Sequence, residues 1–200
     1  MYENHTLIGI SEQKVMELFL GLERHYFAEI ARKTNLTRPR TMRALRKLVE
    51  AGILQIKAEA NVKYYYLTRS PLAYAVLGIV EYNRTAAFLE RNKTLKRALE
   101  MFSSGYRDHL IMLVFGSYAK GYASKSSDID LLLAKEDFQK TEIKMIEELA
   151  GTVNGRTGLK ISPYMMKTGE LRQKKDFVKE IMDNHILLEG AELFFRLVME

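Results

Sequence analysis

The sequence predicts an α+β protein that is made of two lobes and a pair of connecting helices. Residues 1–70 show three helical patterns followed by a hairpin pattern. Residues 71–105 show two further helical patterns, and residues 106–200 combine apolar runs of strand length with amphipathic helices. We therefore expect domain boundaries near residues 70 and 105.

The composition excludes several classes of protein. Apolar residues make up 47% of the 200 residues, which is ordinary for a globular chain. The absence of cysteine excludes a disulfide framework and a cysteine-based zinc site. No apolar run reaches membrane-spanning length and no signal-peptide pattern is visible. We therefore expect a cytoplasmic protein with no membrane partner.

Positive charge is concentrated in the N-terminal third of the chain. The net charge is +6, and residues 1–70 hold 12 Lys and Arg against 7 Asp and Glu, a net of +5. The remaining residues hold 19 against 18, a net of +1. Such a one-sided basic region predicts a polyanionic partner for the N-terminal lobe.

The N-terminal lobe contains helical patterns over residues 12–20 and 27–33, and Asn35 fits the left-handed turn that ends a helix. Thr37 can cap a third helix, which carries Pro39 in its first turn and stops at Gly52. Its predicted apolar stripe comprises Met42, Leu45, Leu48 and Val49. From Arg32 to Lys47 the chain holds seven basic residues and no acidic one.

A hairpin follows the third helix, with strands at residues 53–56 and 62–68 and a turn at Ala60 and Asn61. The pattern from Ser11 to Thr68 resembles the winged helix-turn-helix of bacterial and archaeal transcription regulators. The resemblance implies that the third helix enters the major groove of double-stranded DNA. The residues that would meet phosphates and base edges are Arg38, Arg40, Arg43 and Lys47. The alternatives are a solvated basic face or a winged helix that contacts protein.

Two amphipathic patterns, residues 72–89 and 94–102, connect the lobes, and Ser103 to Gly105 ends the second. Long helices beside a winged helix often form a dimer contact. By this analogy we expect a homodimer.

The stretch from Leu110 to Ala134 carries the chemistry of the C-terminal lobe. An apolar strand pattern ends at Gly116-Ser117, and ten residues later Asp128 and Asp130 open a second strand pattern. Glycine permits a tight turn, whose amides can point at a phosphate. Residues two apart in a strand face the same way, so both carboxylates project together. This predicts a Mg²⁺ site beside a phosphate-binding turn.

These residues resemble the signature of the DNA polymerase β-type nucleotidyltransferases, above all the minimal nucleotidyltransferases. The resemblance implies a small mixed sheet with packed helices, on which Gly116 and Ser117 hold nucleoside triphosphate. It also implies that Asp128 and Asp130 are catalytic and bind Mg²⁺ or Mn²⁺. An active member would move a nucleoside monophosphate onto a hydroxyl of a partner protein or a small molecule. The alternative is a strand–loop–strand unit with a surface Asp-x-Asp.

The rest of this lobe is expected to contain a helix over residues 138–150, a glycine-rich turn over 151–158 and a third strand over 159–166. Helices are expected over 169–183, through Leu188 and over 191–198. Pro163 argues for an edge strand or a bulge. In the loop, Lys120 and Lys125 either contact phosphate or face solvent, and Ser127 is expected to bond its own backbone.

One part of the signature is missing. By resemblance, active members carry a third carboxylate on the strand after the Asp-x-Asp strand, yet this chain has no Asp or Glu between Glu148 and Glu170. Ser162 or Lys160 occupies the expected position. Three interpretations stay open: slow transfer or transfer with a base from another chain, nucleotide sensing without turnover by a transcription regulator, or a structural remnant.

Overall fold

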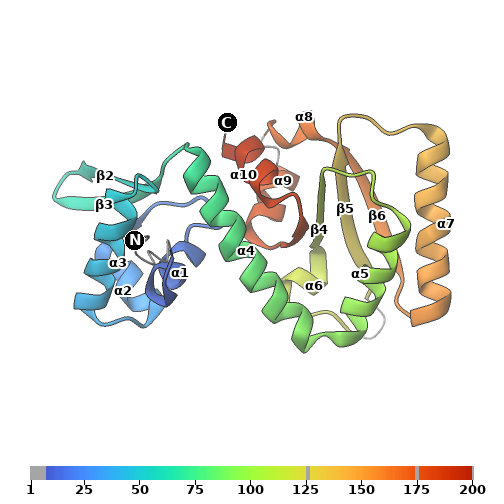
Figure 1. Cartoon of the computed structure of the whole chain (residues 1–200), viewed down its shortest axis with the longest axis horizontal. Coiled ribbons are helices and arrows are strands. Elements are labelled where there is room, and N and C mark those ends of the chain that lie inside the picture. Colours follow the sequence, from blue (N-terminus) through green and yellow to red (C-terminus); the bar gives the residue numbers. More distant parts are fainter. Residues whose placement is uncertain (1–7, 125–126, 174–175, 200) are drawn as a thin grey trace, which may run out of the picture. The chain divides into compact units, whose positions relative to one another are not determined.

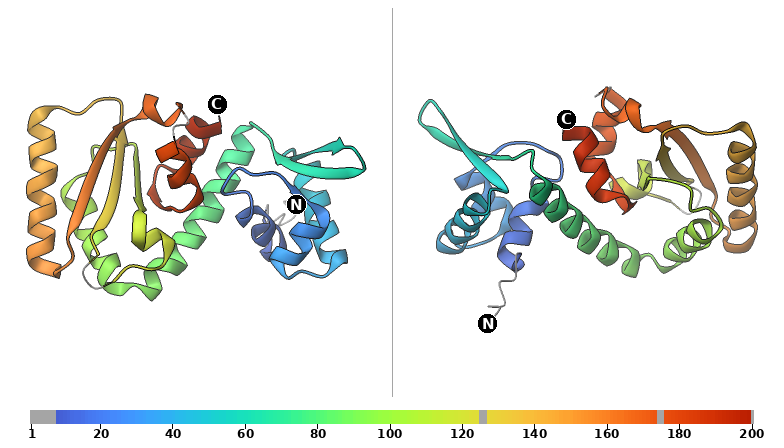
Figure 2. Two further views of the ribbon diagram at one scale, coloured as in Figure 1. Left: turned by 180° about the vertical axis from the view of Figure 1, so that it is seen from behind. Right: turned by 45° about the horizontal axis from the view of Figure 1, so that its top comes forward.

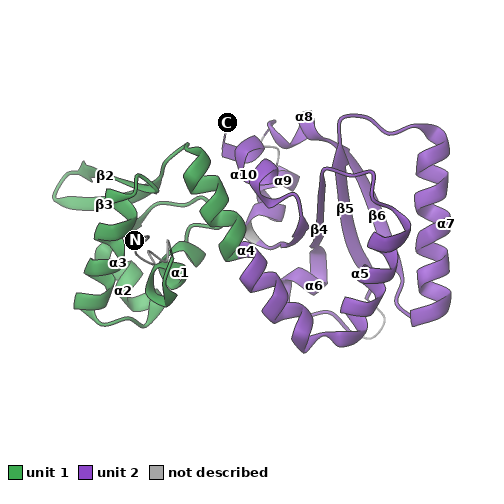
Figure 3. Cartoon of the chain, viewed as in Figure 1, with its two compact units in different colours: residues 1–80 green, residues 81–200 purple. Residues whose placement is uncertain are grey.

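The computed structural model describes residues 8–124, 127–173 and 176–199. The chain divides into two compact units, residues 1–80 and 81–200 (Figure 3). Helix α4 (Pro71–Arg91) crosses the division, and the boundaries expected near residues 70 and 105 stay predictions. Within the described residues, no helix is both long and apolar enough to span a bilayer.

The N-terminal unit has the predicted order of three helices and a hairpin (Figure 1). Its elements are α1 (Ile10–Glu17), β1 (His25–Tyr26), α2 (Phe27–Thr34), α3 (Arg38–Glu50), β2 (Leu54–Glu59) and β3 (Val62–Leu67). The three strands form one antiparallel sheet in the order β1-β3-β2. This arrangement confirms the predicted winged-helix fold.

The ends of these helices follow from local chemistry. Asn35 ends α2 in the left-handed conformation, with φ of 53°. Thr37 precedes α3 with an extended backbone, and Pro39 is the second residue of the helix. The predicted apolar stripe was partly wrong, because Met42 is 44% exposed. Thr41 is buried instead, and its hydroxyl donates a hydrogen bond of 3.1 Å to the Thr37 carbonyl, so this buried hydroxyl has a partner.

The C-terminal unit is built on a four-stranded mixed sheet with strand order β6-β5-β4-β7. Strands β5 and β6 are parallel, and the other two pairs are antiparallel. The strands are β4 (Ile111–Phe115), β5 (Ile129–Lys135), β6 (Ile161–Lys167) and β7 (Ile186–Glu189). The helices that follow α4 are α5 (Lys93–Gly105), α6 (Gly116–Lys120), α7 (Lys140–Thr157), α8 (Thr168–Leu171), α9 (Asp176–Asp183) and α10 (Ala191–Met199).

Helices cover both faces of this sheet. On one face, Phe102 of α5 and Val153 of α7 pack with Val114 and Leu131 of the strands in one buried cluster. Helices α8 to α10 lie on the other side, and α10 contacts β4 (Figures 1 and 2). The middle strands β4 and β5 are therefore shielded on both faces over most of their length. Gly116 directly follows β4 and Asp128 directly precedes β5, and both residues are only partly buried.

Three sequence-based expectations for this unit were wrong. The single helix expected over residues 169–183 is interrupted, because α8 ends at Leu171 and turn residues 172 and 173 follow it before α9. Helix α7 continues to Thr157 through the expected glycine-rich turn, because Val153 is fully buried, and Gly158 ends the helix with φ of 71°. The short helical piece expected through Leu188 is strand β7, which pairs with β4. Pro163 lies on β6, which is an edge strand, as proline in a sheet favours.

A buried carboxylate of α4 is paired within the helix and also ties α4 to β7. Glu81 is fully buried, and its carboxylate accepts hydrogen bonds from the Arg84 guanidinium at 2.6 and 2.9 Å. It also accepts the Leu187 amide at 3.0 Å. The buried charge is thus paired and hydrogen-bonded, which is the condition for its stability inside a protein.

Candidate functional site

The turn after β4 packs directly against a carboxylate. Phe115, the last residue of β4, pairs with Asp130 of β5. Gly116 follows with φ of 67°, and a Cβ added there would lie 2.0 Å from Asp130 Oδ2. Only glycine therefore permits this close approach. Gly116 and Ser117 supply the first amides of α6, and the first amides of a helix have no partner within the helix.

Asp128 and Asp130 lie on the same side of the chain. Ile129 between them is fully buried, whereas both aspartates are partly exposed. The alternation follows from strand geometry, in which every second side chain shares a face. The structure thus brings Gly116, Ser117, Asp128 and Asp130 to one end of the sheet.

The two carboxylates have different electrostatic environments. A hydrogen bond from the Lys160 ammonium lowers the pKa of Asp128, and the Ser162 hydroxyl adds to that effect. Burial raises the pKa of Asp130, and the negative charge of Asp128 raises it further. Pairs of acids whose pKa values are pushed apart in this way are typical of functional sites.

The start of β6 and the residue before it bring a serine and a lysine to Asp128. The Lys160 ammonium lies 2.6 Å from Asp128 Oδ2, and the Ser162 hydroxyl donates to the same oxygen at 3.1 Å. Ser162 is also the cross-strand partner of Asp130. The predicted occupants of the third-carboxylate position are therefore both at the pair. In the described part of the chain, no group of three or more His, Asp or Glu side chains could hold a metal.

The loop between α6 and β5 is held by local and helical contacts. The Ser127 hydroxyl accepts the Ser124 amide at 2.9 Å, which confirms the expected backbone bond. The Lys120 ammonium forms an ion pair with Glu180 of α9. Lys125 lies outside the described residues. Lys120, the last residue of α6, is thus already paired with a carboxylate of the protein.

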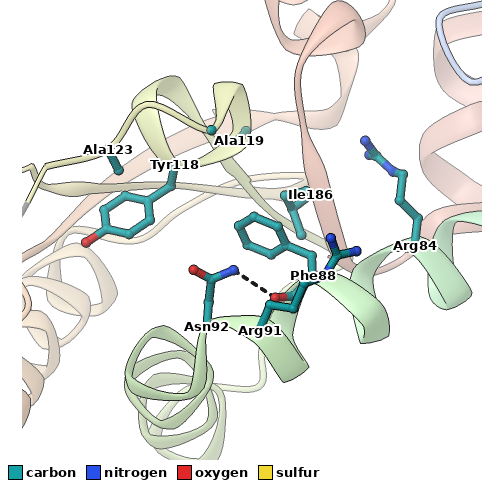
Figure 4. A pocket seen from close by; sticks show the side chains of 9 residues that line it. Arg84, Phe88, Arg91, Asn92, Tyr118, Ala119, Ala123 and Ile186 are labelled. Carbon is teal, nitrogen blue, oxygen red and sulfur yellow. Dashed lines mark hydrogen bonds between the residues drawn. The ribbon is translucent and has the colours of Figure 1, made fainter.

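Two cavities lie in the C-terminal unit, and the second is lined by the two residues that contact Asp128. The first has a volume of about 490 Å³ and lies between α4 and the α6 segment (Figure 4). Its lining residues are Arg84, Phe88, Arg91, Asn92, Tyr118, Ala119, Gly121, Ala123 and Ile186. Burial raises the pKa of Tyr118 in this lining, and the negative charge of Asp128 raises it further. The second, of about 420 Å³, is lined by Lys160 and Ser162 together with residues of α7.

An aromatic cluster adjoins the carboxylate pair and was not anticipated from the sequence. Phe115, Tyr164 and Phe177 have ring centroids 5.1 to 6.3 Å apart. Tyr164 is 47% exposed and lies two residues beyond Ser162 on the same face of β6. The two-residue spacing of Ser162 and Tyr164 could have placed Tyr164 on this face. The position of Phe177 depends on the packing of α9, which the spacing does not predict.

The basic residues of α3 form a stripe on the N-terminal unit. Arg40, Arg43 and Lys47 are exposed and follow the spacing that aligns side chains along one side of a helix. Arg38 is also exposed, but it lies two positions before Arg40, and its guanidinium sits 5.5 Å from the centre of the Phe27 ring. The structure therefore groups three of the four predicted DNA contacts and sets Arg38 apart.

Two family models match the chain. Residues 98–191 match the model described as Polymerase beta, Nucleotidyltransferase, and residues 14–56 match the IclR helix-turn-helix domain. The chain carries a helix-turn-helix domain and a polymerase β-like nucleotidyltransferase domain. The nucleotidyltransferase match includes β4, the Gly116 turn, both aspartates and β6, and thus confirms the resemblance seen in the sequence.

One curated relative bears a functional name. It is the Methanocaldococcus jannaschii protein MJ1305, named as a protein adenylyltransferase, which is 32% identical over 87 residues. The match covers 42% of this chain, and the chain spans 59% of the length of that relative.

Solved structures give only distant likenesses. The adhesin competence repressor AdcR of Streptococcus pyogenes has a TM-score of 0.39 and 18% identity, over 47% of this chain and 69% of its own. The archaeal chromatin protein TrmBL2 has a TM-score of 0.30 and 19% identity, over 90% of this chain and 74% of its own. These likenesses add nothing to what the family models establish.

Proposed function

We propose that the protein binds double-stranded DNA through its helix-turn-helix domain and a nucleoside triphosphate through its nucleotidyltransferase domain. We further propose that it transfers a nucleoside monophosphate onto an acceptor hydroxyl. One observation carries the proposal: the Gly116 turn lies against Asp130, with Asp128 on the same side. An anion-binding turn beside two carboxylates suits a triphosphate accompanied by a cation.

The residues fit one divalent ion and not two. Asp128, Asp130 and the phosphates of the nucleotide are the oxygen donors that Mg²⁺ or Mn²⁺ takes. The resemblance to the polymerase β-type nucleotidyltransferases implies two ions and three carboxylates in active members, and this arrangement does not fit, because Lys160 and Ser162 contact Asp128. When bound, one ion would offset negative charge on the phosphates.

In the proposed transfer, the acceptor oxygen bonds to the α-phosphorus while the bond from that phosphorus to the pyrophosphate oxygen breaks. Pyrophosphate leaves with the electron pair, and the hydroxyl proton passes to water. Gly116 and Ser117 would orient the phosphates. Without a third carboxylate as base, we expect a rate about 10² to 10⁴ lower than general-base catalysis allows. The name of the archaeal relative supports a protein side chain as acceptor, and a small molecule is the alternative.

A second function is favoured by the Lys160 contact. Because an ammonium holds Asp128, the domain can bind a nucleotide without turnover and act as the sensor of a transcription regulator. Under both functions we place the protein in the cytoplasm as a homodimer, since paired DNA-binding modules read two half-sites.

Incubation of the purified protein with labelled nucleoside triphosphate tests this proposal. We expect saturable binding that depends on Mg²⁺. Pyrophosphate release and label on an acceptor, above the level of an Asp130→Asn control, would establish transfer. Binding without pyrophosphate would establish the sensor, and no binding of any of the four triphosphates would contradict both functions.

A further inference from the structure

Lys160 is held where it can act on Asp128. Its backbone is fixed beside β5, because the Ile129 amide donates to the Lys160 carbonyl at 2.8 Å. Its side chain places the ammonium 2.6 Å from Asp128 Oδ2. The Ser162 hydroxyl, two residues on, donates to the same oxygen at 3.1 Å.

We propose that Lys160 is a tethered cation that takes the place of a second divalent ion at the Asp128–Asp130 pair. The inference rests on the proposed function, because it concerns the same nucleotide site. Its ammonium neutralises Asp128, so the nucleotide brings a single divalent ion. The fixed positive charge also attracts the triphosphate when no divalent ion is present.

Competition for one oxygen is the physical basis. Mg²⁺ binds carboxylate oxygen at about 2.0 to 2.1 Å and demands near-octahedral geometry. Asp128 Oδ2 already accepts two hydrogen bonds, so a metal on that oxygen would compete with both donors. Strand β6 offers no carboxylate that could bind a second ion together with Asp128. Its residue opposite Asp130 is Ser162, and residues 149–169 contain no Asp or Glu.

The chain supplies a matched control at the other end of β6, since Lys160 directly precedes this strand and Lys167 is its last residue. Lys167 of β6 pairs with Asp137 at 2.7 Å, and its side chain is 62% exposed, against 63% for Lys160. The two lysines thus differ mainly in the carboxylate that they neutralise. Asp137 does not belong to the pair beside Gly116.

The test compares the full-length wild type with Lys160→Ala and Lys167→Ala. Mn²⁺ binding is measured by calorimetry without nucleotide, and ATP binding is measured in EDTA. We expect Lys160→Ala to bind Mn²⁺ about fivefold more tightly and metal-free ATP about fivefold more weakly, which is the size of one partly exposed charge interaction. We expect Lys167→Ala to match the wild type in both measurements.

A second variant tests the reverse change. Lys160→Ala combined with Ser162→Asp adds a carboxylate next to Asp130, and we expect two Mn²⁺ per chain with bound nucleotide, against one in the wild type. Equal Mn²⁺ and ATP affinities in Lys160→Ala and the wild type would overturn the inference, as would two Mn²⁺ in the wild type. A wild type that binds no triphosphate with Mg²⁺ would contradict the proposed function, while the Mn²⁺ comparison would still judge Lys160.

Discussion

Replacing Asp128 and Asp130 together by alanine is expected to abolish metal-dependent nucleotide binding. The two carboxylates are the anionic oxygen donors on the side of the Gly116 turn, so their loss removes the cation that offsets the phosphate charge. We expect the affinity for ATP with Mg²⁺ to fall at least about 100-fold, because losing direct ligands costs more than losing their supporting groups. Calorimetric titration of the wild type and the variant measures this change.

The control removes the same charge from elsewhere in the domain. Asp108 and Asp137 are 81% and 58% exposed and form ion pairs with Lys135 and Lys167. Replacing both by alanine should leave the affinity for ATP unchanged. If Asp128→Ala with Asp130→Ala keeps wild-type affinity, the assignment of the nucleotide site is wrong.

Replacing Arg40 and Arg43 by alanine is expected to weaken DNA binding about 10- to 100-fold and to flatten its dependence on salt. Both side chains are exposed on the α3 stripe, and each phosphate contact contributes about 0.9 to the slope of log affinity against log salt. The slope should therefore fall by about 2. Fluorescence anisotropy of a labelled duplex at several salt concentrations gives both quantities.

A charge-matched control separates the α3 stripe from net charge. Lys144→Ala with Arg156→Ala removes two exposed positive charges from α7 of the other domain and should change neither affinity nor slope. Equal losses in both double variants would indicate a nonspecific charge effect. If the wild type binds no duplex with salt-sensitive affinity, the proposal that the protein binds DNA is wrong.

The sequence was most informative where one residue type is required by one geometry. Gly116 must be glycine because of its positive φ and the carboxylate behind it, and Asn35 ends a helix in the left-handed region. Pro163 predicted an edge strand because it cannot donate to a ladder. Such constraints are local, so they can be recognised in a single sequence.

The sequence was misleading where tertiary packing outweighs local preference. Gly151 and Gly155 suggested a turn, but each glycine costs a helix only about 1 kcal/mol relative to alanine, and burial of Val153 offsets part of that cost. Strand β7 was read as helix, because a run as short as Ile186–Glu189 has no decisive periodicity. Its partner β4 determines its conformation.

The contact between Lys160 and Asp128 depends on long-range structure. The two residues are 32 positions apart and meet because β5 and β6 run parallel, joined through α7. The sequence alone shows that the third carboxylate is absent. That the Lys160 ammonium contacts Asp128 in its place follows only from the register of these strands. The register decides that Ser162, and no acidic residue, faces Asp130.

The most direct measurement is anomalous diffraction from crystals grown with Mn²⁺ and a non-hydrolysable nucleoside triphosphate. The account predicts one manganese peak, about 2 Å from a carboxylate oxygen of the Asp128–Asp130 pair. It also predicts phosphate oxygens against the Gly116 turn and the Lys160 ammonium still on Asp128. A nucleotide bound elsewhere, or no manganese at the two aspartates, would contradict it.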